Sequence, residues 1–407
     1  MASVIEQCQV APPPGSAAEL TLPLTYFDHM WLAFHRMRRL LFYKLPIFKP
    51  DFVQNIIPSL KDSLSLTLKH YTPLAGNVAC PLNFSESPEL RYVRGDSVSV
   101  TFFEINMDFK YLIGDYPRTA KDFYHFLPQL AEPKDAPGVQ LAPLLAIQVT
   151  LFPNVGISIG FTNNHVAGDG ATIVGFVRAW ARLNKFGGHE QFLANEFIPF
   201  YDRSVIKDPY ELGKLTWGEM KKHKLEMCDI VSPPDKVRED ATREETDENV
   251  MEFFGCVADC RVQFNPPLPQ SYFGNCLVGY VARIRHADLV GKEGFTMSVE
   301  LIREAIRENM KDEEWILNGN WFKSYSTLDM NQSLSVAGSP KLDLYATDFG
   351  WGRPAKLEFV SIDTGSGISM SLSKSKDFDG DLEVGLSLSK TRMNAFAAIF
   401  THGLSFL

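Results

Sequence analysis

The 407-residue chain lacks the features that would direct it into or across a membrane. It has no apolar run of the roughly 20 residues that a membrane-spanning helix requires. Its first residues, MASVIEQCQVAPPPG, lack the basic start, apolar stretch and small-residue cleavage site of a secretory signal, and they are not rich in arginine like a transit peptide. We therefore expect a cytoplasmic protein with no membrane partner.

Cysteine is also scarce. The six cysteines show no Cys-x-x-Cys spacing, and Cys256 and Cys260 stand four positions apart without a second cluster. Such a pattern is unlike that of a zinc site, which brings together paired ligands from two clusters. No glycine-rich phosphate loop follows a predicted strand. The sequence therefore predicts free thiols, no metal site and no tightly bound cofactor.

An excess of positive charge is absent too. The formal net charge is −9 and the sequence pI is about 5.6, whereas nucleic-acid-binding proteins usually carry a basic patch or stripe. We expect no nucleic-acid partner. The densest basic cluster consists of Arg36, Arg38 and Arg39. It has two interpretations: a solvated helix face, which is the simpler one, or a site for the phosphates of a ligand.

Hydrophobic periodicity divides the chain into predicted helices and strands. Apolar residues recur at helical spacing over 50–70 and again over 171–185. Alternation over 146–152 and 156–162, with a Pro-Asn-Val-Gly turn, predicts a hairpin in which each strand buries one face. Further elements expected near the C-terminus are strands over 356–362, 367–373 and 382–388 and a helix over 390–402.

The residues of chemical interest follow the predicted hairpin. The pattern His165-x-x-x-Asp169-Gly170 lies where the second strand gives way to a helix, and loops at such strand ends often carry catalytic groups. A histidine there could serve as a general base, because its pKa lies near neutral pH. The pattern alone leaves a second interpretation open, in which Asp169 only caps the following helix. We interpret the other eight histidines as structural.

Three motifs occur in the order found in one family. FTNNHVAGDGATIVGFVRAWA surrounds His165, YFGNC follows at 272–276, and DFGWG comes third at 348–352. Together they resemble the plant BAHD acyltransferases over nearly the whole chain. The second motif is typical of the anthocyanin and flavonoid branch, and within that branch the sequence is similar to malonyltransferases that act on phenolic glucosides.

The resemblance implies an α/β protein with the two-domain chloramphenicol acetyltransferase-like fold, mixed sheets and an interdomain channel. A chain of this length also favours two domains. We predict an N-terminal domain over 1–198, a shortened crossover and acidic linker over 199–250, and a C-terminal domain over 251–407. A helix and an aromatic-rich segment that normally precede the strand before Arg261 are missing from this chain near 238–250.

The resemblance also implies roles for the motif residues. His165 would take a proton from an acceptor hydroxyl, and the oxygen would attack the thioester of an acyl-coenzyme A. Asp169 would point away from the substrates and pair with an arginine, and Arg261 stands in that arginine's place. Asp348 is assigned with the active site because its motif is diagnostic, although its Gly-Trp-Gly turn favours a structural role.

The implied co-substrate, malonyl-CoA, suggests further contacts. Its free carboxylate calls for a cationic partner. The candidate is Arg178 on the helix after the motif, and the alternative is an exposed helix arginine. Arg283 and Ser339, near the second and third motifs, are candidate contacts for coenzyme A. The implied reaction is transfer of malonyl to a sugar hydroxyl of a phenolic or flavonoid glucoside, by a monomer without bound metal.

Two other functions stay open on the sequence. A transferase of the same family could use an aromatic or acetyl donor, since that choice depends on whether the donor pocket is cationic or apolar. A catalytically silent relative that only binds ligands or partners is the other alternative, and the missing segment motivates it.

Overall fold

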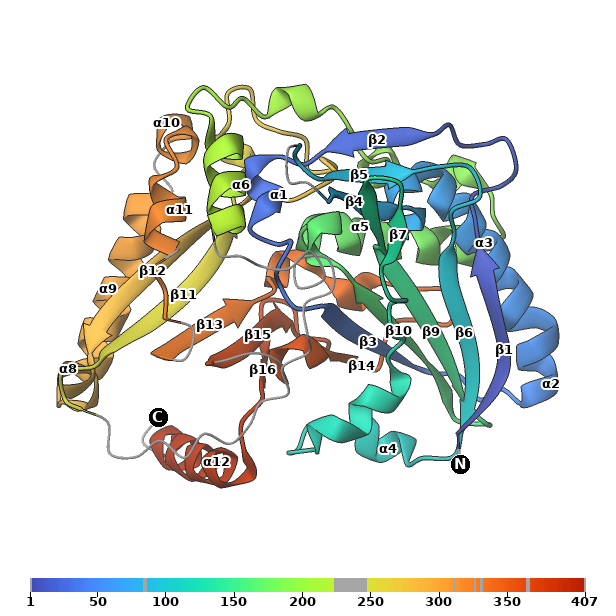
Figure 1. Ribbon diagram of the computed structural model, residues 1–407. Helices are drawn as coiled ribbons and strands as arrows, with labels where there is room; N and C mark the ends of the chain where they lie inside the picture. Colours follow the sequence, from blue (N-terminus) through green and yellow to red (C-terminus); the bar gives the residue numbers. More distant parts are fainter. Residues whose placement is uncertain are drawn as a thin grey trace.

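A computed structural model describes residues 2–82, 86–222, 247–309, 312–325, 327–329, 332–363 and 367–405. Three sheets organise these residues (Figure 1). The largest has the strand order β1-β6-β9-β10-β3-β14. Its strands are β1 (Ala2–Val10), β6 (Val98–Ile105), β9 (Leu145–Phe152), β10 (Gly156–Asn163), β3 (Met37–Lys44) and β14 (Lys356–Glu358).

The other two sheets have five strands each. One has the order β2-β5-β4-β8-β7 and comes from the first half of the chain. Its strands are β2 (Leu20–Pro23), β5 (Glu89–Tyr92), β4 (Asn77–Pro81), β8 (Val139–Pro143) and β7 (Lys134–Ala136). The other has the order β12-β11-β13-β15-β16. It contains β12 (Leu277–Arg285), β11 (Met251–Asp259), β13 (Ser333–Ala337), β15 (Ile368–Lys374) and β16 (Leu382–Leu386).

The predicted hairpin is present as β9 and β10, paired antiparallel across the turn. The prediction that each strand buries only one face was wrong, because every residue of both strands is buried. The polar positions of the alternation face a second covering layer instead of solvent. Gln148 Nε2 donates to the carbonyl of His125 at 2.8 Å, and Thr162 Oγ1 donates to that of Pro128 at 2.6 Å.

Two hydrophobic clusters cover this sheet. On one face, the long helices α3 (Ile57–His70) and α5 (Gly170–Lys185) pack against apolar side chains of β9 and β10. On the other face lies a phenylalanine-rich cluster around Phe42 and Phe126, which includes residues of α4 (Phe109–Leu112). The C-terminal end of β10 is therefore enclosed between these two layers.

The helix predicted over 50–70 is interrupted near its start. It consists of the short α2 (Lys49–Asp51), a π-helical turn over Phe52–Ile56, and then α3. The strand predicted over 356–362 is shorter, because β14 ends at Glu358 and a 3₁₀ turn follows. β14 pairs with β3, so the last third of the chain contributes a strand to the first sheet.

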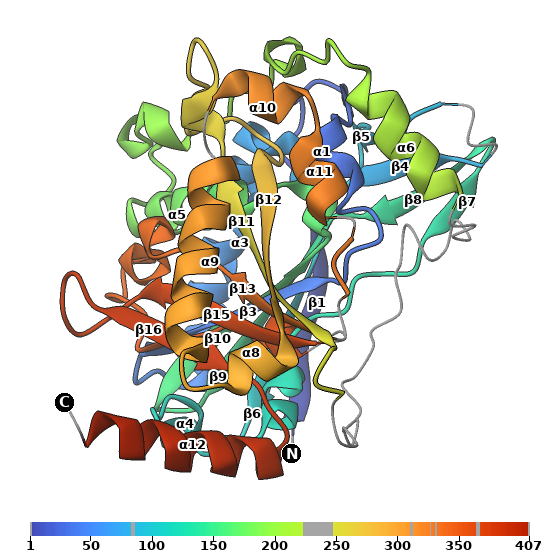
Figure 2. The same ribbon diagram turned by 90° about the vertical axis from the view of Figure 1, so that its left-hand side faces the viewer.

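The third sheet carries helices from the second half. α9 (Gly294–Asn309) runs along β12 (Figures 1 and 2). The C-terminal helix α12 (Lys390–Leu404) lies at the edge of the molecule and has no buried residue (Figure 1). The other α-helices of the described ranges are α1 (Tyr26–His29), α6 (Leu212–Lys222), α8 (His286–Val290), α10 (Glu313–Leu317) and α11 (Asn320–Tyr325).

Residues 223–246 of the predicted crossover and acidic linker over 199–250 lie outside the described residues. In the described ranges no helix combines the length and apolar character needed to cross a bilayer.

Candidate active site

His165 lies directly after the central strand β10. Asn164 caps the 3₁₀ turn over His165–Ala167 with its side chain, which accepts a hydrogen bond from the backbone nitrogen of Val166 at 3.2 Å. The imidazole stacks on Trp31, with ring centroids 3.8 Å apart and planes at 10°. Phe34 approaches the same imidazole edge-on at 5.5 Å. The ring is therefore held between aromatic side chains and is only 8% exposed.

This enclosure determines the protonation state of His165. Burial lowers its pKa from the usual 6.5 to about 4. An interaction with its own backbone raises the pKa, as does the charge of Asp169, whereas the charges of Arg39 and His35 lower it. His165 is consequently neutral at neutral pH, which is the form of a histidine that can accept a proton.

Asp169 is fully engaged by the protein. It is the N-cap of α5, where Oδ1 accepts from the backbone nitrogen of Thr172 at 3.1 Å. Oδ2 accepts from Arg261 Nη1 at 2.8 Å and from the backbone nitrogen of Cys276 at 3.1 Å. With both oxygens occupied and the residue 1% exposed, Asp169 supports the loop from behind. The pairing with Arg261 joins the first half of the chain to the second.

Burial favours the neutral form of Arg261 and so acts to lower its pKa. The charge of Asp169 outweighs this effect, and the pKa of Arg261 is raised overall. The pair is therefore charged, and removing either partner would leave an uncompensated charge in the interior.

A second buried carboxylate, Asp28 of α1, holds the catalytic loop through Asn275. Asp28 Oδ1 accepts from both the backbone nitrogen and the side-chain nitrogen of Asn275 at 3.0 Å. The Asn275 Nδ2 also donates to the carbonyl of His165 at 3.1 Å. Arg203 Nη1 donates to Asp28 Oδ2 at 3.0 Å and to the hydroxyl of Tyr272 at 3.0 Å. The YFGNC motif thus connects this ion pair to the backbone of His165.

The glycine of that motif has a specific geometric role. Gly274 has φ of 134°, which favours glycine, and an added Cβ would stand 2.5 Å from Arg203 Nη1. Only a residue without a side chain lets Arg203 reach Asp28 at this place.

The arginine cluster at 36–39 does not form a solvated helix face, and that interpretation was wrong. Arg38 and Arg39 belong to β3, and Arg36 directly precedes it. Arg36 and Arg39 are buried and Arg38 is half-buried. β3 pairs with β10 in a register that sets Arg39 opposite Phe161, so the cluster lies beside the strand that leads to His165.

Asp348 stabilises its own loop. Its Oδ1 accepts from the backbone nitrogens of Gly350 and Gly352 at 2.8 and 2.9 Å, and Oδ2 pairs with Lys185 Nζ at 2.7 Å. Burial acts to raise the pKa of Asp348, but these hydrogen bonds and the ammonium of Lys185 lower it overall. The following Phe349 is buried against Trp180, with ring centroids 4.9 Å apart. The motif thus fastens the last third of the chain to α5.

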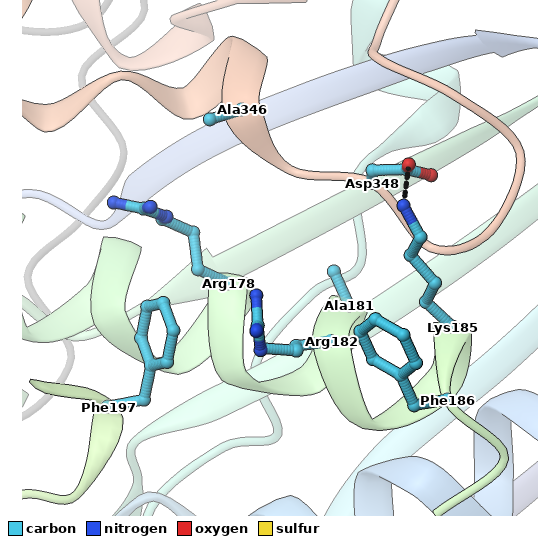
Figure 3. Close-up of a pocket in the computed structure, with 8 residues that line it drawn as sticks. All are labelled: Arg178, Ala181, Arg182, Lys185, Phe186, Phe197, Ala346 and Asp348. Atoms are coloured by element: carbon cyan, nitrogen blue, oxygen red, sulfur yellow. Dashed lines mark hydrogen bonds and ion pairs between the residues drawn. The ribbon is translucent and has the colours of Figure 1, made fainter. Parts of the chain in front are cut away.

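Arg178 and Asp348 line one small pocket of about 130 Å³ on the exposed side of α5 (Figure 3). Arg178 rests on the ring of Phe197, 5.2 Å from its centroid, and in Figure 3 its guanidinium points away from Arg182 and Lys185. His165 is not among the lining residues, which are Arg178, Ala181, Arg182, Lys185, Phe186, Phe197, Ala346 and Asp348.

The other two predicted donor contacts lie apart from each other. Arg283 is exposed on β12, where Nη2 donates to the carbonyl of Ser324 at 3.4 Å and to the hydroxyl of Thr327. Ser339 caps a 3₁₀ turn by accepting from the backbone nitrogen of Lys341 at 3.3 Å. Leu342, at the end of that turn, closely approaches Gly170 at the start of α5. Ser339 is thus on a segment beside the catalytic loop, whereas Arg283 faces α11.

The structure brings together residues that sequence reasoning missed. Trp31, Asp28 and Arg203 all contact the catalytic loop or its supports, yet none stands in a motif that had been interpreted. The YFGNC motif was used only as a family marker, although its Asn275 touches the His165 backbone. The burial of Asp28 and Arg203 would have indicated an internal ion pair, but the sequence alone does not show which charged residues are buried.

Among the described residues, no three His, Cys, Asp or Glu side chains are gathered as metal ligands would be. Five cysteines are free thiols, and Cys228 lies outside the described part of the chain.

The chain is similar to known proteins over its whole length. A family model described as the Transferase family matches residues 3–227 and 236–402. Phenolic glucoside malonyltransferase 1 of Nicotiana tabacum is 72% identical over 453 residues, covering 100% of both chains. The malonyl-coenzyme:anthocyanin 5-O-glucoside-6'''-O-malonyltransferase of Salvia splendens is 40% identical, covering 98% of this chain and 94% of that protein.

Solved structures show the same fold at low identity. Vinorine synthase matches with a TM-score of 0.68 and 18% identity, over 97% of this chain and 96% of that one. TRI101 of F. graminearum, complexed with ethyl coenzyme A, matches with a TM-score of 0.60 and 13% identity, over 94% and 97% of the two chains. The predicted chloramphenicol acetyltransferase-like α/β fold is thereby confirmed.

The alignment with the tobacco protein also shows a difference in length. It runs over 453 positions, whereas this chain has 407 residues, so about 46 positions have no residue of this chain. The family match is interrupted at 228–235, shortly before β11. The match over most of the chain, with 72% and 40% identity to two malonyltransferases, shows that the chain belongs to the Transferase family of BAHD acyltransferases.

Proposed function

We propose that this protein transfers a malonyl group from malonyl-CoA to a sugar hydroxyl of a phenolic or flavonoid glucoside. The observation that carries the proposal is a neutral, buried histidine at the end of β10, supported on two sides by buried ion pairs. The choice of donor and acceptor rests on the 72% identity to phenolic glucoside malonyltransferase 1 of tobacco.

In the proposed mechanism His165 is the general base. It accepts the proton of the acceptor hydroxyl as the oxygen attacks the thioester carbonyl. The tetrahedral intermediate then collapses, the carbon–sulfur bond breaks, and the thiolate of coenzyme A takes the proton from His165. The face of Trp31, 3.8 Å from the imidazole, favours the transient imidazolium because a cation is attracted to the face of an aromatic ring.

Asp169 takes no proton in this scheme. Its two oxygens are occupied by Arg261, Thr172 and Cys276, so it keeps the loop and the ring in place. Asp348 is likewise proposed as a support, since its oxygens hold its own turn and Lys185. Arg178, Arg283 and Ser339 stay predictions as contacts of the donor. We further propose that the protein acts as a monomer in the cytosol.

A catalytically silent relative is the second candidate, because about 46 aligned positions are missing and α12 has no buried residue. A mass-spectrometric assay separates the two. The purified full chain is incubated with malonyl-CoA and a panel of phenolic glucosides, with His165→Ala as the matched control. The proposal expects a malonylated glucoside from the wild type and not from the variant. A folded wild type that forms no product with any acceptor would favour the silent relative.

A further inference from the structure

Arg39 is a buried cation beside the catalytic strand. It lies on β3, directly opposite Phe161 of β10, and Phe161 stands four residues before His165. Only 8% of Arg39 is exposed. Its guanidinium lies 5.7 Å from the centroid of the Phe359 ring. An ordinary arginine at a sheet surface would extend its charge into water, and this one cannot.

Arg39 differs from the other buried arginines near the loop. Arg203 has the carboxylate of Asp28 at 3.0 Å, and Arg261 has that of Asp169 at 2.8 Å. Within the described ranges Arg39 has no acidic partner, and this is the difference. Its Nε and Nη1 are buried without a hydrogen-bond partner; Arg203 and Arg261 also have such nitrogens, but a carboxylate balances their charge. Burial lowers the pKa of Arg39 to about 10, with no carboxylate acting against it. The side chain therefore stays charged at neutral pH.

An unpaired buried charge is costly for a fold, by several kcal/mol per ion as a general magnitude. Unsatisfied buried donors of this kind are rare in native structures and call for an explanation, such as a ligand that completes them. The chemistry of the missing partner follows from the group: a guanidinium is a cation whose planar fork of N–H donors matches a carboxylate, and here Nε and Nη1 still lack an acceptor.

We propose that Arg39 binds the free carboxylate of the malonyl group while the thioester carbonyl lies beside His165. This inference rests on the proposed function and names the residue that selects the donor. In malonyl-CoA the carboxylate is separated from the thioester carbonyl by one methylene group. Its cationic partner must therefore lie close to the reacting carbon, and hence close to the base.

The same placement couples donor recognition to the base. The charged and titratable groups that act on His165 are Arg39, Asp169 and His35, and the charge of Arg39 disfavours the imidazolium. A carboxylate bound to Arg39 neutralises that charge. His165 then accepts a proton more readily when malonyl is bound than when the donor carries a neutral acyl group such as acetyl.

Arg178 is the alternative partner for the carboxylate. It lies on α5, eight residues after Gly170, which corresponds to about 12 Å along a helix. The pocket that it lines contains two further cations, Arg182 and Lys185, but not His165. The charge of Arg39, by contrast, acts on the pKa of His165.

The test compares two donors in five proteins: the wild type, Arg39→Met, Arg39→Lys, Arg178→Met and Arg307→Met. Arg307 is exposed on α9 and serves as the matched control. Steady-state kinetics with malonyl-CoA and acetyl-CoA give the ratio of the two kcat/KM values, with p-nitrophenyl glucoside as acceptor. We expect Arg39→Met to lower the ratio about 10- to 100-fold, the range for a lost charge-assisted hydrogen bond. The lysine variant should be intermediate, because it keeps the charge without the fork.

Two results would overturn the inference. One is an unchanged ratio in Arg39→Met. The other is a fall in the ratio of Arg178→Met that Arg39→Met does not share, which would place the carboxylate at Arg178. Thermal unfolding serves as the folding control, and removing an unpaired buried charge should leave the midpoint unchanged or raise it.

A binding measurement distinguishes an inactive protein from an Arg39 that does not bind the carboxylate. If the wild type forms no malonylated product, binding alone still tests Arg39, through the shift of the unfolding midpoint by each coenzyme A ester. The inference expects malonyl-CoA to stabilise the wild type more than acetyl-CoA, and Arg39→Met to lose that difference. A difference that persists in Arg39→Met would contradict it.

Discussion

The surroundings of His165 and the outer region of the third sheet are covered to very different extents. We define the outer region as β15, β16 and α12. All residues of β9 and β10 are buried, whereas β16 and α12 have no buried residue. Apolar side chains remain in contact with solvent there, with Ile399 73% exposed and Phe396 44% exposed.

This contrast agrees with the difference in length. About 46 positions of the tobacco relative have no residue in this chain, and the family match is interrupted at 228–235, ahead of β11 at Met251. The catalytic loop, by contrast, is held by Asp28, Asp169 and the arginines paired with them, all of which are buried. The ion pairs that support the site are thus in place although the outer region is poorly covered.

The largest expected effect is a loss of transfer activity, in the buried surroundings of His165. His165→Ala removes the base, and we expect transfer to fall about 10²- to 10⁴-fold. The fold should persist, because the substitution creates no unpaired charge. Product formation is followed by mass spectrometry, and circular dichroism checks the fold. Turnover equal to that of the wild type would reject the mechanism.

The next effect is on stability. Arg261→Met leaves the Asp169 carboxylate buried without its cation, so we expect a loss of about 3–5 kcal/mol in the free energy of unfolding. The control, Arg307→Met, changes an exposed pair on α9 and should stay within about 0.5 kcal/mol. Urea unfolding measures both. Equal losses would mean that the buried Arg261–Asp169 pair contributes no more to stability than the exposed pair on α9.

A smaller effect on stability and activity is expected at Asn275, which connects the Asp28–Arg203 ion pair to the loop of His165. Asn275→Ala removes the side-chain Nδ2 donor that the Asp28 carboxylate and the His165 carbonyl share. Both acceptors keep a backbone donor, so the expected loss is that of the hydrogen bonds alone, about 0.5–3 kcal/mol. Because the His165 backbone loses its link to Asn275, kcat should fall more than KM rises. Asn275→Asp should not restore activity, since it places a second carboxylate against Asp28. A variant with wild-type kcat would show that Asn275 does not position the base.

The smallest effect is expected in the outer region. Ile399→Ser on α12 replaces a side chain that is already 73% exposed, so the free energy of unfolding should change by no more than about 0.5 kcal/mol. Leu183→Ser on α5, where the side chain is 1% exposed, is the buried counterpart and should cost several times more. A large loss from Ile399→Ser would mean that something covers α12 in solution.

The sequence predicted the elements around the site better than the contacts between them. The spacing of apolar residues located β9, β10 and α5, and the motif located His165. The alternation of Gln148 and Thr162 misled, because polar side chains can be buried when a backbone carbonyl receives them. The link from Asp28 to Asn275 spans 247 positions, and no local pattern encodes such a contact. For the same reason Arg39 could be mistaken for a solvated residue.

Hydrogen exchange followed by mass spectrometry on the full chain tests the comparison most directly, because slow exchange reports hydrogen bonds that open only with large unfolding. The account predicts that peptides covering 145–170 exchange slowest and that peptides covering 382–404 exchange orders of magnitude faster. Equal protection in the two sets would contradict the claim that the catalytic loop is held independently of the outer region.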